Sequence, residues 1–322
     1  MRSDFVFAAA SLLSQHAMSA SNCAPGPQTR QLVELPGVFI ENVAVRENGD
    51  IIMTTFDDGR IYTVTPSSPN PEARVAVQLE GLNALTGIVE VAPDVFAVAA
   101  NIVDKEVWEF VVGATRIALV DFTPVRLSQD GTPAVDYILD LGDFGVSSIN
   151  GMTSLPSQPN ILLGADSVTG QVWRMDILSR KVELAFLDED LVPGPSGPLS
   201  LSVNGVHAYK DHLYYTNSNA QTFGRVPIDR FGRQTGQSQV FLRTSNSTLL
   251  PDDFAIDQDG NALVAYWPNT LMKITSGGQD ITPLVETLVN PTAVALNKDG
   301  RKAYIVTAGE SRQRGRLVEV EF

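Results

Sequence analysis

Six stretches of the sequence share one pattern: a short apolar strand, a polar or proline-containing turn, and a second apolar strand. The copies are spaced irregularly at about 50 residues, and repeats of this length with internal turns are typical of a β-propeller. They begin at Glu41, Thr86, Asn150, Asn204, Asp252 and Thr292. Because equivalent positions of propeller blades meet around one axis, residues as distant in sequence as Glu41 and Asp252 can share one site.

Turn residues inside the copies indicate strands rather than helices. In the first copy, Asn48 and Gly49 stand between two alternating strands, which is a strong hairpin signal. No stretch has the period of a helix. Several strands in each copy therefore predict an all-β chain folded as a six-bladed β-propeller. We expect residues 31–35 to form an outer strand beside residues 316–322, which closes the ring and removes two sheet edges.

Composition limits the classes of partner. The chain of 322 residues carries a formal net charge of −14. This acidity argues against nucleic acid and against anionic membrane surfaces as partners. No segment is long and apolar enough to span a bilayer. With no break in composition, residues 22–322 are expected to form a single domain.

The first 21 residues resemble a short secretory signal. Arg2 precedes an apolar run at residues 5–13, and small residues follow. The alternative is an unstructured extension. The signal predicts a protein that is secreted or held in the secretory pathway, where the sequon of Asn246, Ser247 and Thr248 would accept a glycan. The single cysteine, Cys23, excludes an intramolecular disulfide.

One mouth of the channel is predicted to bind a ligand. In a propeller blade the first strand lines the channel and the second returns, so first-strand starts and second-strand ends share a face. The mouth would combine carboxylates, amides, hydroxyls and aromatics, a mixture that suits an organic molecule with a few polar groups. The predicted substrate-binding residues are Phe56, Asn101, Asp166, Ser167, Asn217, Phe254, Tyr266 and Trp267. Trp108 and Trp173 are expected in third strands, where they would pack between blades.

The residue types argue against covalent catalysis. Of the three histidines only His207, in a first strand, could serve as a base, and we interpret it as a core or channel-wall residue. The predicted catalytic residues are Glu41, Asp252, Asn150 and Asn204. These four also form an all-oxygen set of the kind that Ca²⁺ or Mg²⁺ prefers. Alternatively, the same residues cap turns at the blade entrances.

The chain resembles the senescence-marker-protein/gluconolactonase group of six-bladed propellers, over roughly residues 35–322. In that group a Glu opening the first blade, Asn residues opening two middle blades and an Asp after a proline hold a divalent metal. Here Glu41, Asn150, Asn204 and Asp252 fall in those places, and residues 203–218 match a characteristic segment. The sequence departs from the group at Asn42, at Asp253 and in a long insert at residues 128–146.

Three short segments resemble a fungal subgroup more closely: Ile-Asn-Gly-Met at 149–152, Val-Asn-Gly at 203–205 and Asp-Asp-Phe at 252–254. Members of that subgroup act as hetero-Diels–Alderases that join a quinone methide to a terpene alkene. The resemblance thus implies a pericyclase of natural-product biosynthesis, in which Glu41 or Asp252 acts as acid or base. Two alternatives remain open: a metal-dependent lactonase of the same fold, and a non-catalytic propeller that binds a ligand or a protein.

Overall fold

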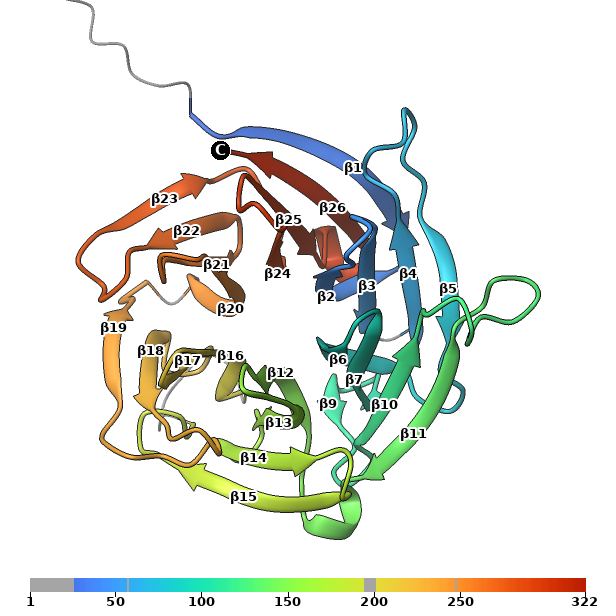
Figure 1. Cartoon of the computed structure of the whole chain (residues 1–322). Helices are drawn as coiled ribbons and strands as arrows, with labels where there is room; N and C mark the ends of the chain where they lie inside the picture. Colours follow the sequence, from blue (N-terminus) through green and yellow to red (C-terminus); the bar gives the residue numbers. More distant parts are fainter. Residues whose placement is uncertain (1–25, 57, 194–200, 247) are drawn as a thin grey trace, which may run out of the picture.

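A computed structural model describes residues 26–56, 58–193, 201–246 and 248–322, which form a ring of β-sheets around a central axis (Figure 1). Four of the sheets have four antiparallel strands each, and an eight-stranded sheet consists of two further four-stranded sets joined by one pair, Phe56 with Ala84. The described residues therefore form six blades, and the predicted all-β propeller is confirmed. The proposed signal at 1–21, Cys23 and Ser247 of the sequon lie outside these residues.

Each blade runs from an innermost to an outermost strand. Blade one has β2 (Phe39–Val45), β3 (Ile51–Phe56), β4 (Arg60–Val64) and β5 (Arg74–Gln78). Blade two has β6 (Ala84–Ala92), β7 (Val95–Asn101), β10 (Arg116–Asp121) and β11 (Ala134–Asp140). Blade three has β12 (Ile149–Leu155), β13 (Gln158–Asp166), β14 (Gln171–Asp176) and β15 (Lys181–Leu187).

The other three blades repeat this order. Blade four has β16 (Val203–Tyr209), β17 (His212–Asn217), β18 (Thr222–Pro227) and β19 (Gln239–Arg243). Blade five has β20 (Leu250–Ile256), β21 (Ala262–Trp267), β22 (Thr270–Ile274) and β23 (Ile281–Val285). Blade six has β24 (Pro291–Leu296), β25 (Lys302–Thr307), β26 (Arg314–Glu321) and, from the start of the chain, β1 (Gln28–Pro36). Helical structure in the described part is limited to two 3₁₀ turns, η1 (Gly142–Phe144) and η2 (Glu310–Arg312).

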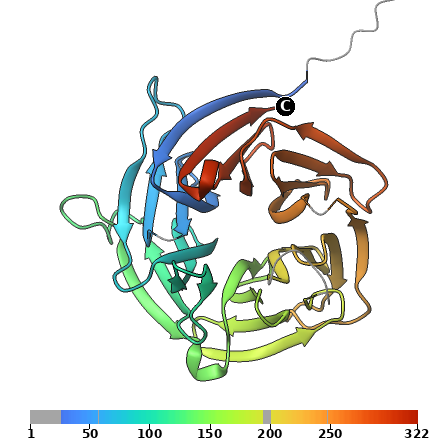
Figure 2. The same ribbon diagram turned by 180° about the vertical axis from the view of Figure 1, so that it is seen from behind.

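The ring is closed by strands from opposite ends of the chain. Strand β1 pairs antiparallel with β26, so that Gln28 lies opposite Glu321 and Pro36 opposite Arg314. The front and back views both show β1 along the outside of β26 (Figures 1 and 2). The outer strand predicted at residues 31–35 is thereby confirmed. Strand β1 covers the outer edge of β26 and becomes the outermost strand of blade six.

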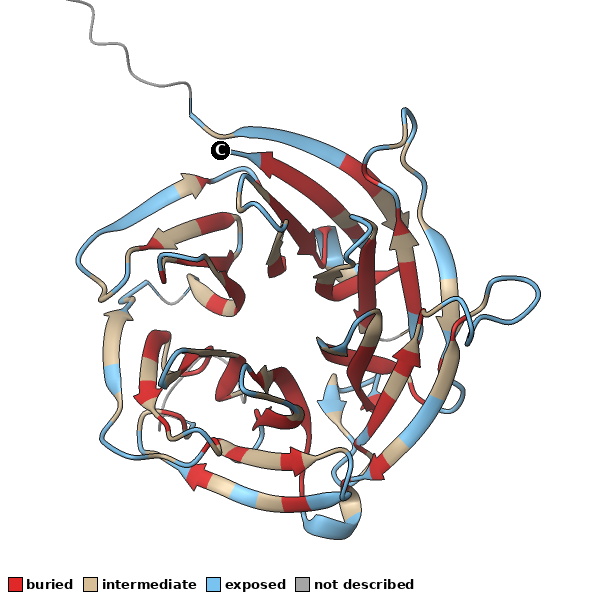
Figure 3. Cartoon of the chain, viewed as in Figure 1, coloured by how far each residue is buried: buried red, intermediate tan, exposed pale blue. Residues whose placement is uncertain are grey.

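The hydrophobic core lies between blades rather than inside them. Six clusters of buried residues among the described ones each combine two neighbouring blades. Phe223 of blade four, for example, packs edge-to-face on Phe254 of blade five with ring centroids 5.1 Å apart. Inner strands are mostly buried and outer strands largely exposed (Figure 3). Since a thin sheet cannot bury its own faces, each blade is stabilised by its two neighbours.

Every innermost strand carries a β-bulge at the residue that opens its sequence repeat. The register with the second strand shifts at Glu41, Thr86, Asn150, Asn204, Asp252 and Thr292. A bulge bends the strand and re-aims a side chain, which is why these positions point away from the regular ladder. The next residue is glycine in blades two to four, and a Cβ at Gly151 would lie 2.3 Å from the carbonyl oxygen of Asn204. Neighbouring inner strands therefore approach closely at the bulges.

Blade two differs from the sequence-based expectation. A hairpin of β8 (Val103–Asp104) and β9 (Glu109–Phe110) is inserted between its second and third strands. Trp108 lies in the turn of this hairpin, so its predicted place in a third strand is wrong, whereas Trp173 does lie in the third strand β14. The insert expected at 128–146 contains the regular fourth strand β11.

Candidate functional site

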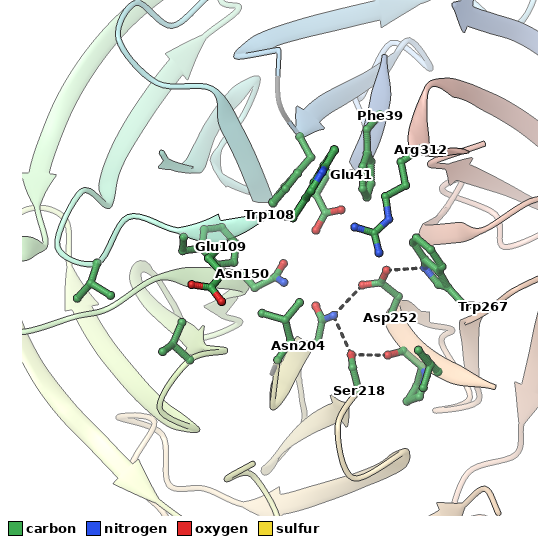
Figure 4. A pocket seen from close by; sticks show the side chains of 17 residues that line it. Phe39, Glu41, Trp108, Glu109, Asn150, Asn204, Ser218, Asp252, Trp267 and Arg312 are labelled. Atoms are coloured by element: carbon green, nitrogen blue, oxygen red, sulfur yellow. Dashed lines mark hydrogen bonds between the residues drawn. The ribbon is translucent and has the colours of Figure 1, made fainter. Parts of the chain in front are cut away.

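A pocket of about 390 Å³ lies where the bulges of several inner strands meet the ends of second strands (Figure 4). The four predicted catalytic residues all line it, together with Phe56 and Trp267 of the predicted substrate-binding set. The remaining lining residues are Phe39, Trp108, Glu109, Phe110, Val112, Val168, Leu201, Ser218, Leu250, Pro251 and Arg312. The bulges thus bring side chains from blades one, three, four and five into one small volume.

Asp252 is held from two sides. Nδ2 of Asn204 donates to Oδ1 of Asp252 at 2.9 Å, and Nε1 of Trp267 donates to Oδ2 at 3.0 Å. The same Asn204 nitrogen also donates to Oγ of Ser218 at 2.9 Å, and that hydroxyl donates to the carbonyl of Pro251 at 2.7 Å. These bonds fix the orientation of the Asn204 amide, whose Oδ1 accepts from none of the residues that the structure describes.

Glu41 and Asn150 are buried, at 6% and 4% exposure, yet neither side chain hydrogen-bonds to a described residue. Buried polar groups are rarely left without partners in proteins, and each such group lining a pocket is a candidate contact for a ligand. Burial raises the pKa of Glu41 well above its ordinary value, and the nearby charges of Asp252 and Asp253 raise it further. These effects favour the neutral acid, which can donate a hydrogen bond into the pocket.

Asp252 is similarly shifted. It keeps some exposure at the pocket, but removal from water raises its pKa to about 8, assisted by the charge of Asp253 and opposed by the hydrogen bonds from Trp267 and Asn204. The site therefore contains two carboxyl groups that are both biased towards the protonated form near neutral pH. Perturbed carboxyls of this kind cluster at functional sites.

Aromatic rings form one wall of the pocket. The ring of Phe56 stacks on Trp108 with centroids 6.1 Å apart and an interplanar angle of 8°, and it meets Phe110 edge-on at 5.6 Å. Phe39 joins this group, with centroids 5.3 Å from Phe56 and 6.5 Å from Trp267. Trp108 and Phe110 come from the inserted hairpin of blade two, which explains why the regular repeat pattern did not reveal them.

Arg312 is a cationic member of the site. Its guanidinium carbon lies 5.3 Å from the ring centroid of Trp108 and 5.6 Å from that of Trp267. It makes no ion pair or side-chain hydrogen bond with a described residue, and Figure 4 shows the side chain reaching towards Glu41 and Asp252. No sequence pattern indicates Arg312, because an arginine in the polar run between the last two strands is typical of a solvated turn.

Six predicted substrate-binding residues lie outside the pocket lining: Asn101, Asp166, Ser167, Asn217, Phe254 and Tyr266. The polar ones are occupied in holding backbone in place. Asn101 Nδ2 and Ser167 Oγ donate to first-strand carbonyls of the next blade, Ile149 and Val203, at 3.0 and 2.6 Å. Asp166 accepts from backbone nitrogens including that of Ser147, and Asn217 donates to the carbonyls of Asp190 and Val192.

The other two, Phe254 and Tyr266, are fully buried in the cluster between blades four and five. Tyr266 precedes the pocket-lining Trp267, and strand alternation turns it into the packing between blades. Phe254 stands two residues after Asp252, and the bulge between Pro251 and Phe254 places it on the opposite side. His207 likewise does not line the pocket; its Nε2 lies 3.1 Å from Oδ1 of Asp253. This places it in the channel wall, away from the pocket lining.

The oxygen atoms of the four predicted catalytic residues fit the ligand preference of a hard divalent cation. Glu41, Asn150 and Asn204 all present oxygens that no described residue engages, and Asp252 adds a second carboxyl. Ca²⁺ and Mg²⁺ take such oxygen ligands. These four residues would hold the ion, which would polarise a carbonyl oxygen as a Lewis acid. No group of three or more His, Cys, Asp or Glu side chains is arranged for a metal within the described ranges.

Residues 201–309 match the family model described as SMP-30/Gluconolactonase/LRE-like region. The chain is 23% identical to the Sarocladium schorii protein named "Putative hetero-Diels-Alderase asR5", over 94% of this chain and 76% of that one. It is 26% identical to a Phoma sp protein named "Putative hetero-Diels-Alderase", over 89% of this chain and 87% of the relative.

The solved structures agree on the fold. A luciferin-regenerating enzyme superposes with a TM-score of 0.67 at 14% identity, covering 92% of this chain and 96% of that one. Regucalcin from Agrobacterium tumefaciens, a calcium-binding protein, superposes with a TM-score of 0.62 at 17% identity, covering 92% and 95%. None of the described helices is long and apolar enough to cross a membrane. The resemblance seen in the sequence is confirmed: the chain carries an SMP-30/gluconolactonase-like region, and its curated relatives bear the name hetero-Diels–Alderase.

Proposed function

We propose that the protein is an enzyme of natural-product biosynthesis, a hetero-Diels–Alderase-like pericyclase that joins a quinone-methide-type partner to a terpene alkene at the mouth of the propeller. The observation that carries this proposal is a pocket walled by aromatic rings whose lining includes two buried polar groups, Glu41 and Asn150, that no described side chain or backbone group engages. The names of the two sequence relatives support the same reaction class.

A cycloaddition suits this arrangement because it needs neither a nucleophile nor a leaving group. The heterodiene C=C–C=O and the alkene form one C–C and one C–O bond, and all atoms of both reactants remain in the product. Holding the two in reactive geometry can lower the barrier by up to about 7–11 kcal/mol. The faces of Phe39, Phe56, Trp108 and Trp267 would stack on a flat conjugated ring and restrict its orientation.

Glu41 and Asp252 would supply the polar part of catalysis. A neutral carboxyl that donates to the heterodiene oxygen stabilises the negative charge that grows there in the transition state. The same group could generate the quinone methide from an alcohol precursor. Its proton would pass to the departing hydroxyl as the C–O bond breaks, water would leave, and the resulting carboxylate would take the phenolic proton. Glu41 suits this role best because it makes no hydrogen bond to a described residue.

We also propose that the protein enters the secretory pathway, on the strength of the signal-like pattern at residues 1–21. Asn246 is exposed, so a glycosyltransferase could reach its side chain. Treatment of the secreted protein with an N-glycosidase should reduce its mass, and Asn246→Gln should abolish the shift. A cytosolic, unglycosylated product would contradict this part of the proposal.

The second candidate is a divalent-metal-dependent lactonase, and the all-oxygen set of Glu41, Asn150, Asn204 and Asp252 specifically favours it. Regucalcin, a structural neighbour, is described as a calcium-binding protein. A third, non-catalytic alternative is a propeller that only binds a ligand or a protein at this mouth.

One experiment separates the three. The purified protein is analysed for bound metal and then incubated, with and without a chelator, with a quinone-methide precursor plus a terpene alkene, and separately with lactones. We expect chelator-resistant formation of a cycloadduct in one stereochemical form, at a rate above heat-inactivated protein. A stoichiometric metal with chelator-sensitive lactone hydrolysis would instead establish the lactonase. If the yield and stereochemistry of the cycloadduct equal those in buffer alone and no lactone is hydrolysed, the result would support the non-catalytic propeller that only binds a ligand or a protein.

A further inference from the structure

The pocket lining is chemically divided around the ring. Blades five, six and one supply Asp252, Trp267, Arg312, Phe39 and Glu41. These residues include the guanidinium and both of the carboxyls with raised pKa. The arc of blades two to four supplies the aliphatic residues of the opposite side: Val112, Val168 and Leu201. The amides of Asn150 and Asn204 belong to this second arc.

The first arc has hydrogen-bond donors available for a ligand that carries oxygen atoms. The guanidinium of Arg312 lies near the faces of two tryptophans, and none of its N–H donors is engaged by a described residue. A guanidinium has five donors in a planar fork and pairs best with carbonyl or acidic oxygens on a flat group. Contact with two indole rings also restricts its movement, so less freedom is lost when a ligand binds.

The second arc has an aliphatic side, beside the polar groups of Glu109, Asn150, Asn204 and Ser218 that line the pocket from the same blades. Val112 is 66% exposed and Val168 is 37% exposed, although both line the pocket. Neither side chain has a polar atom, so water next to them is displaced favourably by a hydrocarbon. Exposed aliphatic groups that border a pocket are typical of a surface that a ligand covers.

Trp108 links the two arcs. It belongs to the hairpin of blade two, yet its ring stacks on Phe56 of blade one and lies beside Arg312 of blade six. Figure 4 shows Glu41 between Trp108 and Arg312, with Asn150, Asn204 and Asp252 around the same opening. Two ligands on either side of these residues would be neighbours within one pocket of about 390 Å³.

We propose that the pocket has two subsites: a ring that carries a carbonyl or acidic hydroxyl binds beneath Arg312 in the arc of blades five, six and one, and a hydrocarbon alkene binds along Val112, Val168 and Leu201. This assignment rests on the proposed two-component function and adds which component each half receives. It also assigns Arg312, which no sequence pattern indicated, as a residue that contacts the oxygen-bearing reactant.

Two unreactive probes test the assignment. Tropolone, a ring with adjacent carbonyl and hydroxyl oxygens, is titrated by quenching of tryptophan fluorescence, and limonene, a hydrocarbon alkene, by headspace measurement of its free concentration. Arg312→Met should weaken tropolone binding about tenfold or more and leave limonene binding within about twofold. Val112→Thr with Val168→Thr, which preserves shape and adds hydroxyls, should have the reverse effect. Saturating tropolone should not displace limonene.

Matched controls come from the same segments. Arg314→Met removes an arginine that instead pairs with Glu34 at 2.8 Å, and Val107→Thr alters a 62% exposed valine of the hairpin that does not line the pocket. Neither should change the binding of either probe. Full tropolone affinity in Arg312→Met, mutual displacement of the probes, or no binding of either to the unaltered protein would overturn the assignment.

The proposal and the proposed function can fail separately. Probe binding requires no reaction, so segregated binding without any cycloadduct would reject the pericyclase and retain the two subsites. Cycloadduct formation by a protein whose probes displace each other would do the opposite.

Discussion

Nδ2 of Asn42 donates a 2.7 Å hydrogen bond to Oδ2 of Asp253, although the two residues are 211 positions apart. They lie in blades one and five, which are separated in the ring by blade six. Oδ1 of Asp253 is also 3.1 Å from Nε2 of His207 in blade four. Asn42 and Asp253 are two of the positions at which the sequence departs from the group it resembles. The two residues that differ from that group thus hydrogen-bond to each other across the axis.

This pair should stabilise the ring without taking part in the reaction. Asn42→Ala leaves one buried oxygen of Asp253 without its donor, so we expect the free energy of unfolding in urea to fall by about 1–3 kcal/mol. The exposed Asn70, whose side chain makes no hydrogen bond within the described part of the chain, provides the control variant Asn70→Ala. Equal midpoints for the two variants would show that the pair contributes nothing to stability.

Glu41→Gln is the cleanest test of the acid. The substitution keeps the shape of a side chain that makes no hydrogen bond to a described residue, so the fold should be unaffected. If the neutral acid donates to substrate and transfers a proton, turnover should fall about 10²–10³-fold, as for the loss of one transition-state contact. Unchanged turnover would leave the shape of the pocket as the source of catalysis.

Asp252→Asn should behave differently from Glu41→Gln. Both oxygens of Asp252 accept hydrogen bonds, from Asn204 and Trp267, so an amide nitrogen at this position must face one of two donors. We therefore expect a loss of turnover together with a lower thermal midpoint. Trp267→Phe removes only one of these bonds while it keeps an aromatic wall, and its effect on stability should be smaller. The reverse order of midpoints would argue against the bonding scheme.

Trp108 should affect binding of the substrate more than the chemical step. Trp108→Ala removes the ring that stacks on Phe56 and borders Arg312. Loss of this stacking surface should raise KM about tenfold, with a smaller effect on kcat. Val107→Ala, at the adjacent exposed position, is the control and should leave both constants unchanged. A loss confined to kcat would mean that Trp108 acts on the transition state instead.

The raised carboxyl pKa values predict a pH dependence of stability. Asp252 has a pKa of about 8 in the folded protein, above its ordinary value of 3.8, and Glu41 is shifted in the same direction. At a pH between 3.8 and about 8, Asp252 keeps its proton in the folded protein but has released it in the unfolded chain. The contribution of these two carboxyls to the free energy of unfolding should therefore be greatest below their ordinary pKa, decrease as pH rises towards about 8, and be lost above the folded pKa.

Urea unfolding between pH 5 and about 9, in the presence of a chelator, measures this slope. Glu41→Gln and Asp252→Asn should each flatten it, because each removes one group that gains a charge. Parallel profiles for the unaltered protein and both variants would show that the two carboxyls are already ionised in the folded state.

The sequence predicted the fold best where the same pattern of strands and turns recurs along the chain. The alternating strands and turns predicted the blades, and the equivalence of repeat starts brought Glu41, Asn150, Asn204 and Asp252 to one pocket. Side-chain direction was harder to predict, because a bulge at each of these residues shifts the register. Phe254 consequently faces the core between blades rather than the mouth, as Tyr266 does by alternation with Trp267.

Insertions and loops were not predictable from the repeat. The hairpin that carries Trp108 obeys no blade pattern, and Arg312 follows Gly309 in a short polar turn. Their positions depend on contacts with each other and with Trp267, which are made only in the folded ring. Residues with the clearest chemical signal were thus found from sequence, whereas those that shape the pocket required the structure.

The pairing of β1 with β26 has a consequence for how the protein is made. Residues that pair across the join, such as Gln28 and Glu321, are the first and last of the described strands to leave the ribosome. Contacts so distant in sequence form slowly, so five blades can collapse before the ring can shut. The pocket takes Glu41 from the first blade and Arg312 from the last. Its ligand therefore meets a complete site only after blade six has been made, and a ligand bound to the folded ring stabilises it.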